Sequence, residues 1–296
     1  WKLGGYQALP QLQVACCGIA PQAQLKDWVA LAGGNEKLQR GMERLYSLFQ
    51  NAPVLGSLIN PRSGGDLLVA EFHELQPLLE KALAQEGKDD TARELAVTAL
   101  GIAKAAEILA DQFTLVATNV PYLGRGKQEE VLQVYCERVY PESKADLATC
   151  FVERCVDFSG LANSTALVTP QSWLFMGSYK KLRGKLLISI QWDSVGRLGT
   201  RAFETISGEV VNVVLLGFTR AKPDARHNFA GVNVAEEKSP ADKAEGLQSK
   251  LCEVVLQSGQ TSNPDSRISF NTHCNAERLS KYAASFLGLG TGDYSH

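Results

Sequence analysis

The sequence has few of the features that mark several large classes of protein. No apolar run reaches the ~18 residues that a membrane-spanning helix needs, and no signal peptide is visible. The four histidines are scattered without the spacing of metal ligands, so no metal site is predicted. The seven cysteines are odd in number and contain no Cys-x-x-Cys pair. We therefore expect reduced thiols in a cytoplasmic protein that has no membrane partner.

Charge of either sign is not in excess either. The formal net charge is −2, which argues against a protein that coats nucleic acid without specificity but leaves room for a local basic groove. The 296 residues, 45% of them hydrophobic, are enough for one large α/β domain or for one domain and part of another. Because the chain begins with Trp1 rather than Met, we expect a fragment of a longer protein.

An apolar stretch at residues 113–118 ends abruptly in a short loop. The loop residues are Asn119, Val120, Pro121 and Tyr122. This pattern predicts a buried strand whose loop presents one amide side chain and one aromatic ring. Ligands of open α/β sheets bind at the carboxyl ends of the strands. We therefore expect strand 113–118 to be central in its sheet, beside strand 165–169, with Asn119 in a concave pocket.

Helices and strands alternate along most of the chain. An apolar stripe with helical spacing predicts a helix up to about residue 50, with Asn35 as its N-cap, and a second clear helix covers 91–110. Further strands are predicted at 11–20, 186–192 and 210–219. Because the later strands follow each other closely, we predict a doubly wound α/β sheet that ends in an antiparallel C-terminal hairpin.

The loop after residue 118 resembles the Asn-Pro-Pro-Tyr motif of adenine-specific DNA methyltransferases. Three segments, 118–128, 144–154 and 166–175, follow one another as in that family, and the large methyltransferases of restriction and phage-defence systems are most similar. The resemblance implies a class I methyltransferase fold, a Rossmann-like sheet with helices on both faces. It also implies S-adenosylmethionine as cofactor and double-stranded DNA with a flipped adenine as substrate. Other subunits of such defence systems are further expected partners.

The chemistry implied by this resemblance concerns the exocyclic amine of adenine, a poor nucleophile because its lone pair is delocalised into the ring. The side-chain oxygen of Asn119 and the carbonyl of Val120 or Pro121 would accept its two protons, which localises the lone pair. Tyr122 would stack on the flipped base. Val120 stands where the common motif has proline, so one φ angle is less restricted while the carbonyl remains.

Each of the other candidate site residues allows a functional interpretation and a purely structural one. Arg125 and Lys127 would contact the DNA backbone, or belong to a solvated turn. Phe203 would stack on the other face of the adenine, or fill the core. Gly18, at the end of the 11–20 strand, would lie near the cofactor together with Asn119, or be part of an ordinary core strand.

The glycine-rich loop that holds the cofactor in this family is not found before the first predicted strand. We therefore expect a catalytic core that is incomplete at its N-terminus (1–220), followed by a polar linker and extension towards a DNA-recognition region (221–296). The chain alone should bind S-adenosylmethionine weakly or not at all and show no methyl transfer. Two alternatives to adenine methylation stay open: a non-catalytic DNA-binding or assembly subunit, and a methyltransferase that acts on protein or RNA.

Overall fold

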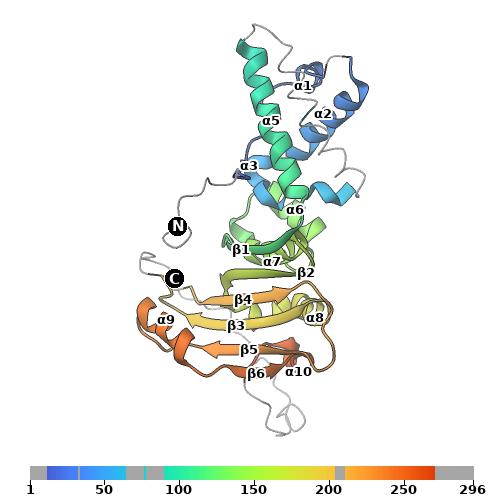
Figure 1. Ribbon diagram of the computed structural model, residues 1–296. Helices are drawn as coiled ribbons and strands as arrows, with labels where there is room; N and C mark the ends of the chain where they lie inside the picture. Colours follow the sequence, from blue (N-terminus) through green and yellow to red (C-terminus); the bar gives the residue numbers. More distant parts are fainter. Residues whose placement is uncertain (1–11, 33, 65–76, 78–89, 204–210, 271–296) are drawn as a thin grey trace, which may run out of the picture.

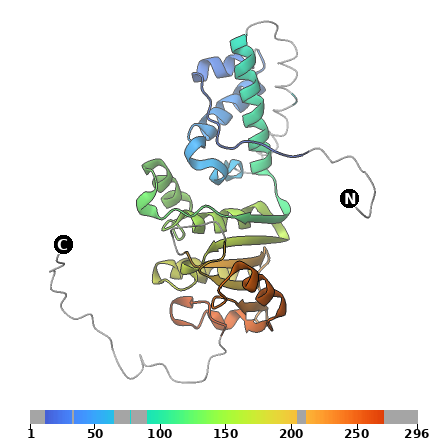
Figure 2. The ribbon, with the colours of Figure 1, turned by 90° about the vertical axis from the view of Figure 1, so that its left-hand side faces the viewer.

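The protein has a helical lobe stacked on a sheet lobe (Figures 1 and 2). The computed structural model describes residues 12–32, 34–64, 77, 90–203 and 211–270. Within these ranges no helix is both long and apolar enough to cross a membrane.

The helical lobe is built from amphipathic helices whose apolar faces meet. Its helices are α1 (Leu25–Ala30), α2 (Glu36–Phe49), α3 (Ala52–Leu55) and the long α5 (Asp90–Ala110). Asn35 caps α2 as predicted, since its side-chain oxygen accepts hydrogen bonds from the backbone of Lys37 and Leu38, both at 3.1 Å. The predicted stripe of α2 is buried: Leu38, Met42, Leu45 and Phe49. These side chains pack in one core with the alanine-rich face of α5.

The sheet lobe contains a six-stranded mixed sheet. Its strands are β1 (Phe113–Asn119), β2 (Ser159–Pro170), β3 (Gln191–Gly199), β4 (Val213–Thr219), β5 (Asn228–Asn233) and β6 (Glu253–Leu256). Their order is β1-β2-β4-β3-β5-β6. β1 and β2 are parallel, β4 runs antiparallel between β2 and β3, and β3 and β5 are parallel. The predicted α/β sheet with an antiparallel β3–β4 hairpin is confirmed.

Helices cover both faces of this sheet. On one face, α7 (Leu147–Phe158) and α8 (Lys180–Ser189) pack against a core that includes Trp173, Trp192 and Phe218. On the other face lies α9 (Pro240–Ser249), whose Leu247 packs beside Leu215 over Gly196. This two-sided cover agrees with the class I methyltransferase architecture predicted above.

The central position predicted for strand 113–118 is wrong. β1 lies at the edge of the sheet, paired with β2 as predicted but with no strand on its other side among the described residues. Six of its seven residues are exposed. The predicted strand at 11–20 is also wrong, since residues 12–16 have no regular structure. An apolar run sets a preference for extended backbone, whereas pairing partners elsewhere in the chain decide its place in the sheet.

Two smaller predictions also differ from the structure. Residues 186–189 continue α8 rather than beginning a strand, and β4 begins at Val213, so residues 211 and 212 of the strand predicted at 210–219 lie outside it. β5 and β6 lie beyond residue 220 and belong to the same sheet as β1 to β4. The boundary between 220 and 221 remains a prediction.

Arg154 joins the two lobes. It lies on α7 and is buried, with its side chain donating hydrogen bonds to the carbonyls of Ser57, Ile59 and Leu109 at 3.1, 2.7 and 3.0 Å. Its guanidinium also lies over the ring of Phe158, 3.8 Å from the centroid. Arg154 therefore attaches the helical lobe to α7 through hydrogen bonds made within the protein.

Candidate functional site

The carboxyl ends of the parallel strands lie together along one side of the sheet. We call this side the carboxyl edge, and it is distinct from the position of β1 as an edge strand. Asn119 ends β1 and pairs with Val168, close to the end of β2 at Pro170. β3 runs parallel to both through β4 and ends at Gly199, which pairs with Val213. Asn119 therefore lies at the edge where ligands of open α/β sheets bind, as its sequence position suggested.

Asn119 and Tyr122 interact directly. The Tyr122 hydroxyl donates a hydrogen bond of 3.2 Å to the side-chain oxygen of Asn119. Burial raises the pKa of the Tyr122 hydroxyl above its ordinary value, which keeps this donor protonated. The Asn119 side chain is exposed and its oxygen has a second lone pair, so the contact orients the amide and leaves one acceptor position for a ligand.

Val120 anchors the beginning of the loop. Its side chain is buried in the core that α7 and α8 cover, and its N–H donates a hydrogen bond of 3.3 Å to the carbonyl of Val168. A proline at this position has no N–H and could not make that bond. Within the described part of the chain, neither the Val120 nor the Pro121 carbonyl accepts a hydrogen bond. The loop therefore offers backbone acceptors next to the Asn119 amide.

The rest of the loop is fixed to the N-terminus of α7. Asp146 caps α7 by accepting from the Ala148 N–H at 2.8 Å, and the same oxygen accepts from Leu123 at 3.4 Å. The Leu123 carbonyl accepts from the Leu147 N–H and from the Gln128 side chain, both at 2.9 Å. The contacts of Leu123 were not predicted, whereas the aspartate before an apolar helical run is a recognisable N-cap signal.

Arg125 and Lys127 both lie on the short turn after this loop. Arg125 forms an ion pair of 3.1 Å with Glu137, which also pairs with Lys144. These two cations, Lys144 first, hold the pKa of Glu137 below its ordinary value. A DNA phosphate at Arg125 would have to share the guanidinium with Glu137. Lys127 is exposed and is not without a partner either.

The structure places Phe203 at the same edge as Asn119, but not beside it. Phe203 is 37% exposed and follows the end of β3 by four residues. β1 and β3 are three inter-strand steps apart, roughly 14 Å. The stacking roles of Tyr122 and Phe203 on one base therefore remain predictions. Gly18 is exposed, and a Cβ built on it would meet no atom within 4 Å.

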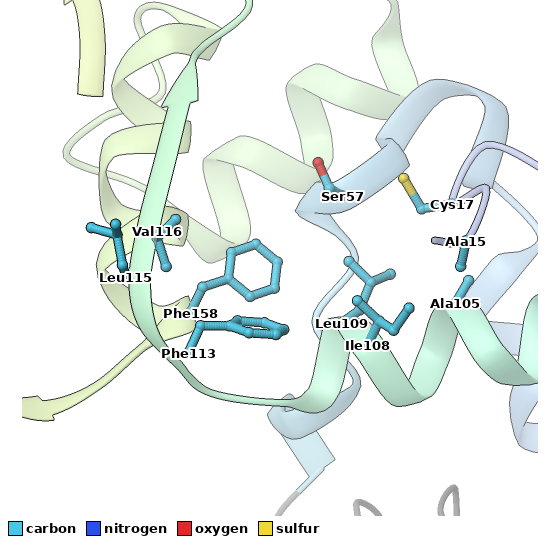
Figure 3. A pocket seen from close by; sticks show the side chains of 10 residues that line it. All are labelled: Ala15, Cys17, Ser57, Ala105, Ile108, Leu109, Phe113, Leu115, Val116 and Phe158. Carbon is cyan, nitrogen blue, oxygen red and sulfur yellow. The ribbon is translucent and has the colours of Figure 1, made fainter. Parts of the chain in front are cut away.

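A cavity of about 300 Å³ lies between the helical lobe and β1 (Figure 3). β1 is also the strand that ends at Asn119. The segment before Gly18 reaches it through Ala15 and Cys17. Burial raises the pKa of the Cys17 thiol, so this group is neutral. The lining is otherwise nearly all apolar: Ser57, Ala105, Ile108, Leu109, Phe113, Leu115, Val116 and Phe158.

This cavity does not fit S-adenosylmethionine. It has no carboxylate for ribose hydroxyls and no cation for the carboxylate of an amino acid. The residues that line this cavity therefore do not form a complete cofactor site. The roles predicted for Gly18 and Asn119 in cofactor binding, and the weak cofactor binding of this chain, stay predictions.

Comparisons with known proteins agree with the motif around Asn119. Residues 65–194 match the family described as Eco57I restriction-modification methylase. The chain is 34% identical over 182 residues to the adenine-specific methyltransferase BrxX of Escherichia coli O9:H4 (strain HS), covering 62% of this chain and 15% of BrxX. It is 37% identical over 110 residues to the adenine-specific methyltransferase PglX of Lacticaseibacillus casei (strain Zhang), covering 36% of this chain and 9% of PglX.

Among solved structures, a nuclease-deletion mutant of the Type ISP restriction-modification enzyme LlaGI, in complex with a DNA substrate mimic, aligns at a TM-score of 0.42 and 12% identity. That alignment covers 68% of this chain and 22% of LlaGI. The chain thus spans only a small part of these relatives. All three motif segments, 118–128, 144–154 and 166–175, lie inside the matched family region. Residues 65–194 are accordingly similar to the Eco57I restriction-modification methylase family, and the two curated relatives above are both named adenine-specific methyltransferases.

Proposed function

We propose that this chain supplies the adenine-binding part of a DNA methyltransferase. The reaction is transfer of a methyl group from S-adenosylmethionine to the exocyclic amine of adenine in double-stranded DNA, within a cytoplasmic restriction-modification or phage-defence system. The observation that carries the proposal is the exposed Asn119 amide at the carboxyl end of β1, oriented by the hydroxyl of Tyr122 at 3.2 Å.

The loop provides what the amine of adenine requires. The Asn119 oxygen has one free lone pair, and the carbonyls of Val120 and Pro121 accept no hydrogen bond within the described residues. Two such acceptors localise the nitrogen lone pair and aim it, without the need for a group of shifted pKa. S-adenosylmethionine would supply the electrophilic methyl group. The chain's own contribution is to bind and orient the amine.

The fixed loop also suits capture of a flipped base. Because the Leu123 backbone and Asp146 tie the loop to α7, the ring of Tyr122 is held in place before any base arrives. A pre-ordered ring loses little conformational entropy on stacking, which strengthens binding of an unstacked base. We infer that Tyr122 stacks on the target adenine.

A second candidate is a non-catalytic subunit that binds DNA through the same edge. It is favoured by the apolar lining of the cavity beside β1, which lacks the polar groups that S-adenosylmethionine needs. A methyltransferase of protein or RNA is a third candidate, because other amines and amides present the same protons to two acceptors. These candidates differ in which molecule receives a methyl group.

The test is radiolabelled methyl incorporation by the complete protein, with the Asn119→Ala variant beside it. We expect label in adenine of duplex DNA, and a loss of about 10²–10³-fold in rate for Asn119→Ala, as for removal of one hydrogen-bond partner used in the transition state. DNA affinity should stay within a few-fold. Asn228→Ala is the matched control, since Asn228 is exposed at the opposite end of the sheet.

Each alternative has its own outcome in this experiment. Unchanged methylation by Asn119→Ala would refute the role of Asn119. Label in protein or RNA in place of DNA would support the third candidate. DNA binding without label in any acceptor would support the non-catalytic subunit.

A further inference from the structure

Three buried cations of the sheet lobe use their donors within the protein. Arg154 donates to three carbonyls that join the lobes. Arg183 donates from all three nitrogens, to the carbonyls of Trp173, Met176, Asp265 and Ser266. Lys243 donates to the carbonyls of Leu198 and Val234 at 2.7 and 3.0 Å. Because dipoles of the backbone surround each charge, these side chains have structural roles.

Arg197 on β3 is different. It makes one hydrogen bond within the described residues, from Nη2 to the carbonyl of Ile268 at 2.7 Å. Its Nε is buried and has no acceptor there, and none of the ion pairs among described residues includes it. Burial lowers the pKa of Arg197, while the charge of Glu253 opposes this from beyond ion-pair distance. Leaving donors of such a cation unpaired is costly unless a ligand supplies acceptors.

Two aromatic rings lie close to this guanidinium. Its carbon lies 4.7 Å from the ring centroid of Phe175 and 4.4 Å from that of Phe270. Phe270 lies over Gly231, where a Cβ would come within 2.8 Å of the ring, so the glycine makes room for it. With both rings against the guanidinium, the remaining donors point along its edge. A planar edge of N–H donors matches the oxygens of a phosphate or carboxylate.

Arg197 also lies at the edge of the sheet that carries Asn119. It pairs with Val214 on β4 and Asn233 on β5, two residues before β3 ends at Gly199. Its strand is three inter-strand steps from β1, roughly 14 Å, which is similar to the width of a DNA major groove, about 12 Å. A duplex with one adenine at Asn119 would therefore extend over this part of the edge.

We propose that Arg197 binds a phosphate of the DNA backbone, with Nη1 as a donor that none of the described residues uses. This inference rests on the proposed function, because it requires DNA at this edge of the sheet. A phosphate contact fixes the register of the duplex on the protein without selecting a sequence. The carboxylate of S-adenosylmethionine presents the same oxyanion chemistry, and the experiment separates the two sources.

The experiment measures how the affinity of the complete protein for a DNA duplex depends on salt. Each phosphate contact contributes about 0.9 to the slope of log affinity against log salt concentration. Arg197→Met keeps apolar volume between the two phenylalanines. It should make the dependence on salt shallower, reducing the magnitude of the slope by about 0.9. Arg197→Lys keeps the charge and should restore the slope. Arg226→Met, which removes an exposed arginine just before β5, is the matched control and should leave the slope unchanged.

The possible outcomes separate this inference from the proposed function. Failure of the unmodified protein to bind DNA would contradict the proposed function. DNA binding with equal slopes for the unmodified and Arg197→Met proteins would overturn only the role of Arg197. Weaker S-adenosylmethionine binding by Arg197→Met, with an unchanged slope, would also overturn it and assign the oxyanion to the cofactor. If Arg197→Met does not fold, as shown by its melting temperature, Arg197→Gln provides the same comparison.

Discussion

Strands β1 and β4 are both seven residues long and rich in apolar side chains, yet their surroundings are opposite. β4 pairs on both sides, with β2 and β3, and is covered on both faces. Leu216 and Phe218 are 3% and 1% exposed. β1 pairs with β2 alone, and Leu115 is 61% exposed. Apolar composition therefore favours a strand but does not decide whether that strand becomes the centre of a sheet or its edge.

The different surroundings of β4 and β1 separate the strand that stabilises the sheet from the strand that carries the candidate site. β4 contributes apolar burial to two core clusters, whereas β1 contributes an exposed amide at its carboxyl end. Because β1 is anchored to β2 along its length and to α7 through its loop, Asn119 at its end is held in place without being buried. We expect substitutions in the two strands to affect different measurements.

The largest expected difference in stability is between Leu216→Ala and Leu115→Ala. Leu216 is buried, so its truncation leaves a cavity and should lower the free energy of unfolding by about 2–5 kcal/mol. Leu115 is mostly exposed, and its truncation should change that free energy by no more than about 0.5 kcal/mol. Chemical denaturation of both variants measures the difference. Equal destabilisation would mean that β1 is as well covered as β4 in solution.

The next effect concerns the ring that follows β1. Tyr122→Ala should weaken capture of a flipped base by about 1–3 kcal/mol, the usual contribution of stacking on an aromatic side chain. Tyr122→Phe is the control, because it keeps the ring and removes only the hydroxyl that orients Asn119. The measurement is the fluorescence of 2-aminopurine placed at the target position in bound DNA. An identical signal from the alanine variant and the unmodified protein would exclude Tyr122 as the stacking residue.

The smallest expected effect is the pH dependence of the ion pairs beside the loop. Lys144 and Arg125 hold the pKa of Glu137 below its ordinary value of 4.5 in the folded state. A depressed pKa stabilises the fold at pH values above 4.5, and this contribution is lost as the pH falls through the folded-state pKa. Thermal melts of Glu137→Gln should therefore show a slightly lower melting temperature at neutral pH. The two proteins should converge in acid, and a difference that persists there would contradict this origin.

Local features of this fold followed from the sequence alone. Asn35 caps α2, and Leu38 and Met42 are buried on one stripe, because capping and helical periodicity depend on residues within a few positions of each other. The β3–β4 hairpin and the position of Asn119 at a strand end were predictable for the same reason. The motif after β1 also pointed to the family that residues 65–194 match, since the residues of such a short motif are adjacent in the sequence.

Tertiary structure alone decided the features that depend on distant partners. The edge position of β1 depends on which strands pair with it, and the sequence of β1 itself contains no such information. The bond from the Val120 N–H to Val168 joins two strands and gives a physical reason for valine in place of proline. Arg197 looks like any strand arginine until Phe175 and Phe270, from separate segments, enclose it. The sequence determines which chemical groups are present. Which of them become buried, and which buried donors stay unpaired, is decided only when remote segments pack together.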